Sequence, residues 1–237
     1  MSKVYFTGAG PGDPGLITVK SMDLINRADL LVYAGSLVNP ELVEKAGARV
    51  KLDSQHMSLE ELTVTMVNWA RQGKLVVRLH SGDPSLYGAI VEQIAELEKY
   101  GIFVEVIPGV SSMFAAAAAL QTQYTLKGVS ESVIVTRPAG ATLEEDQIRE
   151  FSRTGATLVI FLGTEKLAEI VKKLECPAET PVAVVYHASW PDQKVVRGTV
   201  ADIVDKVKVA EIEKTALIIV GGIVDPMLAY QRSVLYS

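Results

Sequence analysis

The stretch Gly8-Ala9-Gly10-Pro11-Gly12-Asp13-Pro14-Gly15 follows an apolar segment, Val4-Tyr5-Phe6, and precedes a helix-like segment at 18–28. This order predicts a glycine-rich turn at the carboxyl end of a first β-strand. Open α/β sheets bind their ligands at that edge, outside the carboxyl ends of parallel strands. The stretch therefore predicts both an α/β fold and the position of a binding site.

The glycine spacing of this turn also matches two phosphate-binding motifs, and neither agrees with the residues around it. The dinucleotide motif requires an acidic residue at the end of the second strand, whereas the second apolar run, 30–33, ends in Ala34-Gly35-Ser36. Pro11 and Pro14 also remove backbone donors from the turn. A P-loop would need Lys followed by Ser or Thr where this chain has Leu16-Ile17. We expect a ligand other than phosphate near this turn.

Composition narrows the class of protein. The 237 residues are 49% hydrophobic and 22% charged, enough to bury a sizeable core. A net charge of -5 and a pI near 5.3 give no bulk attraction to nucleic acid or to an anionic membrane. The longest apolar run, 113–120, is far shorter than the ~20 residues that span a bilayer. The single cysteine, Cys176, is typical of a reducing compartment, and with no signal-peptide pattern at the start we expect a cytoplasmic protein.

Strand-like and helix-like segments alternate along the chain, which predicts a mainly parallel sheet covered by helices. In the first half we expect strands at 4–7, 30–33, 75–79 and 103–107. In the second half we expect strands at 133–136, 157–162, 182–186 and 216–220, with an extra strand, 194–200, antiparallel to a neighbour. The prediction is two α/β domains, residues 1–122 with a mainly parallel sheet and residues 123–237 with a mixed sheet.

Three further turns are candidate parts of a site, and each has a simpler explanation. Ser81-Gly82-Asp83-Pro84 would lie beside the first glycine turn, although Gly-Asp-Pro is also ordinary turn chemistry. Pro108-Gly109-Val110-Ser111-Ser112 opens an alanine-rich helix whose small side chains allow close approach of a ligand or of another helix. Thr136-Arg137-Pro138-Ala139-Gly140 is a candidate anion-binding loop, although a lone Arg is more often simply solvated.

The usual catalytic constellations are missing from the sequence. His56, His80 and His187 lack metal-ligand spacing, so we expect no metal site in the protein. There is no Gly-x-Ser-x-Gly elbow. Such a chain suits a reaction in which a cofactor supplies the reactive group and the protein orients two reactants.

Taken in order along the chain, these turns resemble those of the tetrapyrrole methylases, a family of two-domain α/β enzymes that use S-adenosyl-L-methionine. The resemblance covers nearly the whole chain and rests on the segments 4–13, 77–84, 107–112 and 216–221. Within the family, the segments 33–40, 80–88 and 136–140 resemble the branch that methylates precorrin-4, or its cobalt complex, at carbon 11 in cobalamin synthesis. Any cobalt would then arrive inside the substrate.

The resemblance implies that the cofactor, and its product S-adenosyl-L-homocysteine, lie in a cleft between the domains and are held mainly by backbone groups. The implied cofactor contacts are Pro11, Ser81, Gly82, Asp83, Leu86, Ser111, Ser112, Leu162, Ala188 and Ala216. Uroporphyrinogen methyltransferases carry an acidic residue at the position of Ala34 and a lysine near that of Ser54, so the resemblance assigns no general base here. It also implies a homodimer, which would cover apolar helix surfaces such as 113–120.

A tetrapyrrole substrate carries many carboxylates, which need cationic or backbone-donor partners even in an acidic protein. Arg137 is the strongest candidate because Pro138 and Gly140 fix a turn around it and its guanidinium can hold a carboxylate through two hydrogen bonds. The other candidates for substrate contact are Ser36, Asn39, Arg78 and His80. The alternatives are a uroporphyrinogen, ribosomal RNA or protein substrate within the same family, an NAD-dependent oxidoreductase, or a ligand-binding module without catalysis.

Overall fold

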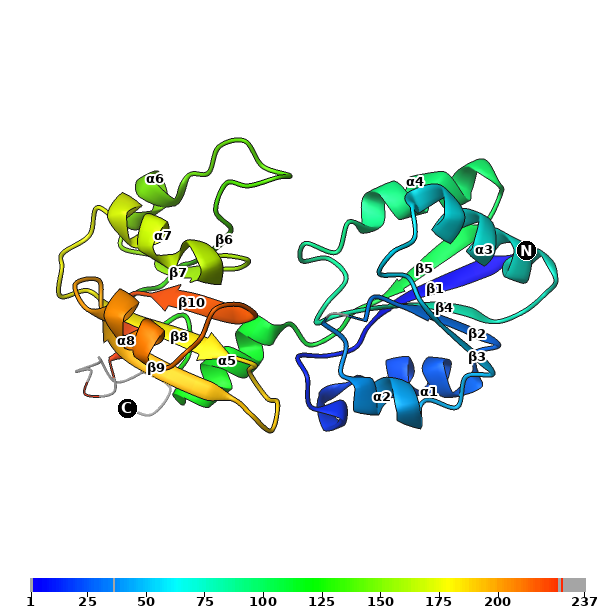
Figure 1. Cartoon of the computed structure of the whole chain (residues 1–237), viewed down its shortest axis with the longest axis horizontal. Helices are drawn as coiled ribbons and strands as arrows, with labels where there is room; N and C mark the ends of the chain where they lie inside the picture. Colours follow the sequence, from blue (N-terminus) through cyan, green and yellow to red (C-terminus); the bar gives the residue numbers. More distant parts are fainter. Residues whose placement is uncertain (1, 36, 226, 228–237) are drawn as a thin grey trace. The chain divides into compact units, whose positions relative to one another are not determined.

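The computed structural model describes residues 2–35, 37–225 and 227, which fold into two compact units, Met1–Ser112 and Met113–Ser237 (Figure 1). Each unit has a five-stranded sheet with helices packed against it. The predicted class, two α/β domains with one parallel and one mixed sheet, is confirmed.

The first unit holds a fully parallel sheet in the order β3-β2-β4-β1-β5. Its strands are β1 (Lys3–Gly8), β2 (Leu30–Tyr33), β3 (Val50–Asp53), β4 (Val76–His80) and β5 (Phe103–Ile107). The register pairs Gly8 with His80 and Thr7 with Ile107. The turns that leave β1, β4 and β5 therefore start side by side at one edge of the sheet.

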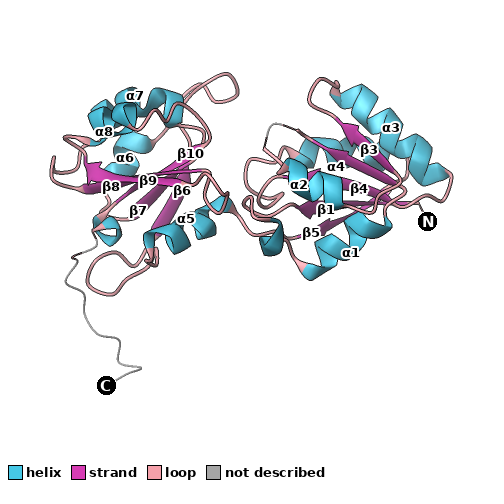
Figure 2. Ribbon diagram, turned by 60° about the horizontal axis from the view of Figure 1, so that its bottom comes forward, coloured by secondary structure: helices cyan, strands magenta, loops and turns pink. Residues whose placement is uncertain are grey.

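Helices cover both faces of this sheet (Figure 2). They are η1 (Pro14–Leu16), α1 (Val19–Arg27), α2 (Pro40–Lys45), α3 (Leu59–Arg71) and α4 (Ile90–Lys99). Ile25 of α1 and Leu42 of α2 pack with Leu79 on one face, while Met66 of α3 and Leu97 of α4 pack with other strand residues on the opposite face. The central strand β4 is consequently buried on both sides.

The second unit holds a mixed sheet in the order β6-β7-β10-β8-β9. Its strands are β6 (Val133–Thr136), β7 (Thr157–Ile160), β8 (Pro181–Tyr186), β9 (Lys194–Thr199) and β10 (Ala216–Val220). β6 and β7 are parallel, and the pairs β7–β10, β10–β8 and β8–β9 are antiparallel. β9 is the extra antiparallel strand that the sequence predicted.

The helices of the second unit are α5 (Ser112–Leu120), α6 (Ile148–Ser152), η2 (Thr164–Lys166), α7 (Leu167–Lys173), α8 (Ile203–Val209) and η3 (Gly222–Val224). Buried side chains of α6, α7 and α8, among them Ile148, Ile170 and Ile203, pack with strand residues such as Ile160 and Ile218. This cluster is the core of the unit.

Helix α5 is tied to the second unit, whereas the sequence analysis expected it in the first domain, which was predicted to end at residue 122. The Tyr124 hydroxyl donates a hydrogen bond to the Met113 carbonyl. The guanidinium of Arg197 in β9 donates to the Leu120 carbonyl at 2.9 Å. The helix is therefore held at both ends by partners in the second unit, and the compact division falls at its start.

Candidate functional site

Three turns of the first unit meet backbone to backbone at the carboxyl edge of its sheet. A Cβ atom added to Gly8 would lie 2.6 Å from the Cα of Gly109, and one added to Gly109 would lie 2.7 Å from the Cα of Gly8. Either added Cβ would also collide with the Gly82 carbonyl oxygen. Two backbone hydrogen bonds, of 2.9 and 3.3 Å, join Gly10 to Gly82. Glycine is required at positions 8 and 109 because the three chains lie too close for a side chain.

Gly82 is a glycine for a different reason. Its φ is +59°, in the left-handed region that L side chains rarely adopt. A Cβ at this position would have its nearest neighbours at 3.7 Å, so there is room for a small side chain. The constraint at Gly82 is the backbone conformation rather than the available space.

Asp83 holds two of these turns together. Its carboxylate accepts hydrogen bonds from the Gly109 N–H at 2.7 Å and from the Ser85 N–H at 2.8 Å. Burial alone would raise the pKa of Asp83, but the hydrogen bonds from the Ser85 side chain and from these backbone groups outweigh it and hold the pKa below its ordinary value. The charged carboxylate therefore fixes the position of the Pro108-Gly109 turn.

The first glycine turn is braced from α2. The Asn39 side-chain amide donates to the Gly12 carbonyl at 2.8 Å, and its oxygen accepts from the Glu41 N–H at 2.9 Å, capping the helix. Asn39 is buried, as is Pro11 within the turn. Asn39 thus positions the turn, and its predicted contact with substrate stays a prediction.

Arg78 and His80 were predicted near the substrate, and both side chains lie inside the first unit with 7% exposure each. The Arg78 guanidinium donates to Ser54 Oγ at 2.8 Å and to Gln93 Oε1 at 3.2 Å. Burial, opposed by the charge of Asp53, lowers the pKa of Arg78 to about 10. Arg78 is therefore a buried charge rather than a cation on the surface of the first unit.

His80 is held neutral by its surroundings. Burial and, to a smaller extent, the charge of Arg78 lower the pKa of His80 to about 3. Its Nε2 atom is buried and has no hydrogen-bond partner among the described residues, and its ring centroid lies 5.4 Å from that of Phe6. A neutral imidazole of this kind can donate or accept one hydrogen bond, but it is a poor general base.

The remaining predicted residues of the first unit also lie near this edge. Ser81 and Leu86 are half-buried in the turn after β4, Ser111 is 3% exposed, and Ser112 is the first residue of α5. Ser36, which was predicted to contact substrate, lies outside the described residues.

In the second unit, the predicted residues gather at the edge formed by the carboxyl ends of β6, β7 and β8. Leu162 follows β7, is 61% exposed and has a φ of +53°. Ala216 begins β10, pairs with Tyr186, and its N–H and carbonyl both hydrogen-bond to Thr164 Oγ1. Ala188, two residues beyond β8, is buried. These residues lie at one edge of the second sheet, and their contact with a cofactor stays a prediction.

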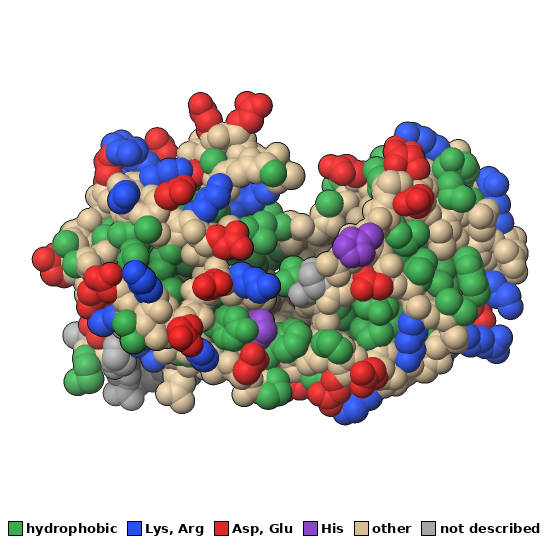
Figure 3. All heavy atoms as spheres, in the orientation of Figure 1, with side chains coloured by type: hydrophobic (Ala, Val, Ile, Leu, Met, Phe, Trp, Pro, Cys, Tyr) green, Lys and Arg blue, Asp and Glu red, His purple; other side chains and the backbone are tan. Residues whose placement is uncertain are grey.

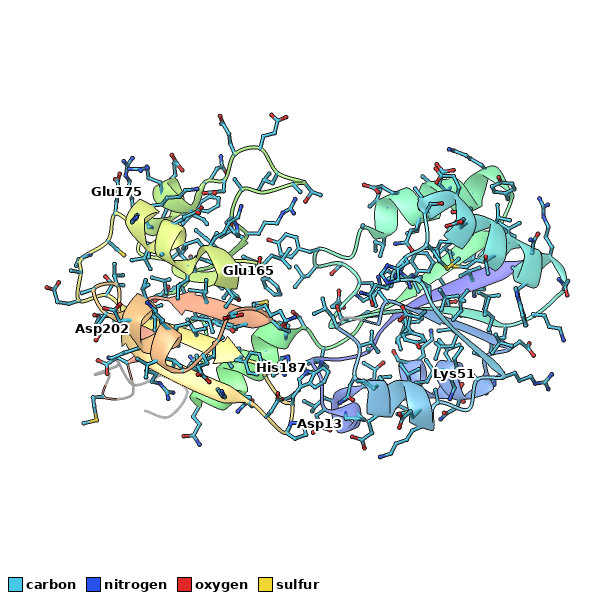
Figure 4. All side chains as sticks on the ribbon, viewed as in Figure 1. Asp13, Lys51, Glu165, Glu175, His187 and Asp202 are labelled. Carbon is cyan, nitrogen blue, oxygen red and sulfur yellow. The ribbon has the colours of Figure 1, made fainter. Side chains whose placement is uncertain are left out.

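A stacked aromatic group braces the loop that carries Ala188. The ring of His187 stacks on Tyr186 at 3.8 Å and on Trp190 at 4.8 Å, and its Nδ1 lies 3.0 Å from both Asp192 carboxylate oxygens. In Figure 4, His187 and Glu165 lie at one edge of this sheet, and Glu175 and Asp202 lie at the opposite edge. His187 therefore belongs to the same edge as Leu162 and Ala216.

Arg137 leaves the carboxyl end of β6 at this edge and is half-buried. Its guanidinium donates to Thr142 Oγ1 at 2.6 Å and to the Thr142 carbonyl at 3.0 Å.

Three residues that shape the turns were not predicted as part of the site, namely Gly8, Asp53 and Gly109. The Asp53 carboxylate accepts a hydrogen bond from the Gly35 N–H at 3.0 Å. Gly8 and Gly109 both lie in motifs quoted above, so the sequence already indicated that these positions belong to the site.

The described residues contain no group of three or more His, Cys, Asp and Glu side chains that could hold a metal ion. None of the helices described is long and apolar enough to cross a membrane. On the face shown in Figure 3, Lys and Arg side chains are interspersed with Asp and Glu side chains.

Comparison with known proteins identifies the family. The model of the "Tetrapyrrole (Corrin/Porphyrin) Methylases" matches residues 3–204. This chain belongs to the tetrapyrrole methylases. The match includes the turns of the first unit and the segments around Arg137, Leu162 and Ala188, and it ends before the segment 216–221.

Individual relatives agree with this assignment. The chain is 54% identical over 242 residues to a cobalt-precorrin-4 C(11)-methyltransferase of Methanocaldococcus jannaschii, covering 99% of this chain and 93% of that protein. A precorrin-4 C(11)-methyltransferase of Pseudomonas aeruginosa is 46% identical, with 93% and 90% covered. Among solved structures, a cobalt precorrin-4 methyltransferase described as a cobalamin biosynthetic enzyme superposes with a TM-score of 0.91 at 42% identity, covering 95% of this chain and 97% of that one. A uroporphyrin-III C-methyltransferase from Thermus thermophilus, complexed with S-adenosylhomocysteine, gives a TM-score of 0.81 at 29% identity, with 94% and 98% covered.

Proposed function

We propose that this methyltransferase uses S-adenosyl-L-methionine to methylate cobalt-precorrin-4, or precorrin-4, at carbon 11 during cobalamin biosynthesis. The observation that carries the proposal is the meeting of the Gly8, Gly82 and Gly109 turns backbone to backbone at one sheet edge. The high identity to enzymes of that name supports the choice of substrate.

The residues present suit a cofactor that is recognised mainly through backbone groups. A Cβ atom added to Gly82 would come no closer than 3.7 Å to its nearest neighbours, the backbone atoms of Ser111 and Ser112, so main chain lines this side of the turn. We assign the cofactor to Pro11, Ser81, Gly82, Asp83, Leu86, Ser111 and Ser112 of the first unit and to Leu162, Ala188 and Ala216 of the second. Asp83 acts through its hydrogen bond to Gly109, which keeps the facing turn in place.

S-adenosyl-L-methionine supplies an electrophilic methyl group when it is bound, so the chain needs no nucleophile of its own. What the residues must do is hold the two reactants in line and exclude water. The close backbone packing of the glycine turns fixes the backbone groups to which we assign the cofactor. We assign no general base, since His80 is held neutral with a pKa of about 3.

The substrate's carboxylates require cations near the surface. Arg137 meets that requirement because its guanidinium is oriented by two hydrogen bonds to Thr142 and is only half-buried. Arg78, being buried, contributes a positive potential from inside the first unit rather than a surface contact. We also propose that the enzyme is a cytoplasmic homodimer that binds no nucleic acid and no membrane.

Calorimetric titration with S-adenosylhomocysteine, NAD and ATP tests the cofactor assignment. We expect saturable binding of S-adenosylhomocysteine and none of the two nucleotides. Binding of NAD in its place would overturn the assignment and would favour an oxidoreductase. An assay of methyl transfer to uroporphyrinogen III tests the alternative substrate, because the chain is also 36% identical to a uroporphyrinogen-III C-methyltransferase.

A further inference from the structure

A lysine that the sequence analysis did not select lies against the loop that carries Arg137. β6 and β7 are parallel neighbours, with Thr136 opposite Ile160, so the segments that follow them start side by side. Lys166, the last residue of η2 after β7, donates a hydrogen bond from Nζ to the Ala139 carbonyl at 2.5 Å. Lys166 of η2 therefore contacts the loop, residues 137–146, to which Arg137 belongs.

This loop is held in shape by its own hydrogen bonds. Gly140 and Leu143 exchange two backbone hydrogen bonds, of 2.7 and 3.1 Å. The Asp146 carboxylate, 1% exposed, accepts from the Ala139 N–H at 2.8 Å and from Lys173 Nζ at 2.6 Å. The ion pair between Asp146 and the partly exposed Lys173 fixes the loop to α7, so a ligand would meet cations that are already positioned.

An open space lies beside Gly140, next to the ammonium group of Lys166. Apart from the two chain neighbours of Gly140, the described residues place one atom within 4 Å of a Cβ built at this position, the Lys166 Nζ at 3.4 Å. Gly140 is exposed and does not need positive φ. The position is thus accessible from solvent and lies at the distance of a polar contact from a positive charge.

We propose that Lys166 and the open position at Gly140 form a carboxylate-binding subsite beside Arg137, which takes one of the peripheral carboxylates of the tetrapyrrole. The inference rests on the proposed function and adds to it a specificity-determining residue. The described hydrogen bonds use one of the three N–H donors of Lys166, and their acceptor is a neutral carbonyl, so the positive charge stays available to an anion. A carboxylate at this place gains a charge-assisted hydrogen bond, and Arg137 offers a second cation from the loop that Lys166 contacts.

Lys166 could instead serve only to tie η2 to the loop, and two variants separate these roles. Lys166→Met removes both the positive charge and the hydrogen bond to the Ala139 carbonyl. Gly140→Ala leaves the lysine, its charge and its hydrogen bond to Ala139 in place and fills the open position with a methyl group. A purely structural lysine would make the second variant silent.

The experiment measures KM for enzymatically prepared cobalt-precorrin-4, the Kd of S-adenosylhomocysteine and the unfolding temperature. We expect KM to rise about tenfold in Lys166→Met, on the scale of one charge-assisted hydrogen bond, and severalfold in Gly140→Ala. Kd and unfolding temperature should stay at the wild-type values, and Lys166→Arg should recover part of the KM. Lys172→Met, at an exposed lysine of α7, is the matched control and should change nothing.

Each outcome decides the matter. A wild-type KM in both Lys166→Met and Gly140→Ala overturns the subsite. The subsite is also overturned if Lys166→Met loses stability while Gly140→Ala keeps the wild-type KM, because Lys166 would then serve only to hold the loop against η2. A wild-type enzyme that transfers no methyl group to cobalt-precorrin-4 overturns the proposed function itself, and the subsite with it.

Discussion

The glycines of the candidate site are required for two separable physical reasons, and the distinction makes the cofactor assignment testable. At Gly8 and Gly109 there is no room for a side chain, whereas at Gly82 there is room but the backbone is left-handed. Substitution at Gly82 therefore disturbs the turn without forcing neighbouring chains apart.

We predict that Gly82→Val weakens S-adenosylhomocysteine binding by about tenfold or more while the fold survives. A β-branched residue in the left-handed backbone conformation destabilises the folded protein by roughly 1–2 kcal/mol. The turn can relieve this strain by changing its backbone conformation. Calorimetric titration of the variant measures the loss.

Gly73→Val is the matched control. Gly73 follows the C-cap of α3 with a φ of +74°, and no atom of the described residues lies within 4 Å of its missing Cβ, so its substitution carries the same backbone cost away from the turns. We expect it to lower stability and leave the Kd unchanged. Equal losses of affinity in the two variants, or none in a folded Gly82→Val, would remove Gly82 from the cofactor site.

A second prediction at the scale of the residue concerns His80 and pH. The pKa of its imidazole is about 6.5 in the unfolded chain and about 3 in the folded protein, where burial and Arg78 lower it. Because the folded-state pKa is depressed, the unfolded chain takes up the proton first as pH falls below 6.5. The contribution of neutral His80 to stability is present above that pH and is lost as pH falls toward 3.

We expect wild-type protein to lose about 2 kcal/mol more unfolding free energy than His80→Gln between pH 7 and pH 5. Urea unfolding of both proteins at the two pH values measures this difference. Parallel losses in the two proteins would show that His80 is solvated or protonated in the folded state, and the buried position described here would be wrong.

Arg78 and His80 illustrate what a sequence can and cannot indicate about single residues. Arg78 was predicted near the substrate as a cation and His80 as a polar residue; His80 is the last residue of β4, and Arg78 is its middle residue. β4 is the central strand of five, however, so both of its faces are covered and the two side chains are interior. Covering of both faces depends on strand order, which local sequence does not specify. Lys166 was missed for a similar reason, since it meets Ala139 only through the pairing of β6 with β7.

At the scale of the element, the attachment of α5 defines where the second unit begins. The helix is apolar on nearly every side, so its hydrophobic pattern does not reveal which unit it packs with. The hydrogen bonds from Tyr124 and Arg197 to the carbonyls of Met113 and Leu120 decide this. Burial raises the pKa of Tyr124, so its hydroxyl stays protonated as a donor.

We predict that Tyr124→Phe lowers the stability of the second unit by about 1–3 kcal/mol, because it leaves the buried Met113 carbonyl without this donor. Hydrogen exchange followed by mass spectrometry should show faster exchange in α5. Tyr100→Phe removes a hydroxyl from an exposed ring and should have no such effect. Unchanged exchange in α5 of the Tyr124 variant would show that the hydrogen bond does not hold the helix.

Elements with a clear period and clear turns were predicted well, and short exposed elements were not. The predicted extra strand, 194–200, is β9, and Ser58 with Glu61 forms a capping box at the start of α3. β3 was not predicted, because Val50-Lys51-Leu52-Asp53 is short and mostly exposed at the edge of the sheet. Its existence depends on pairing with β2.

At the scale of the whole molecule, the glycine turns and the family motifs were sufficient to predict the class of fold and the family. We predict in addition that the protein is a homodimer, because helices of both units expose large apolar side chains, among them Val19, Val91 and Phe114. Sedimentation at micromolar concentration should give a species of twice the 25.6 kDa chain mass. A single species of 25.6 kDa would contradict the dimer.

The most direct test of the central claim is transfer of a labelled methyl group. Wild-type protein is incubated with S-adenosylmethionine carrying ¹³C in its methyl group and with enzymatically prepared cobalt-precorrin-4, and the tetrapyrrole is analysed by mass spectrometry and ¹³C NMR. The account predicts one added methyl group, located at carbon 11, together with S-adenosylhomocysteine in equal amount. Methylation at another carbon, or of uroporphyrinogen III in preference to cobalt-precorrin-4, would contradict the proposed substrate, and no transfer to either would contradict the proposed function.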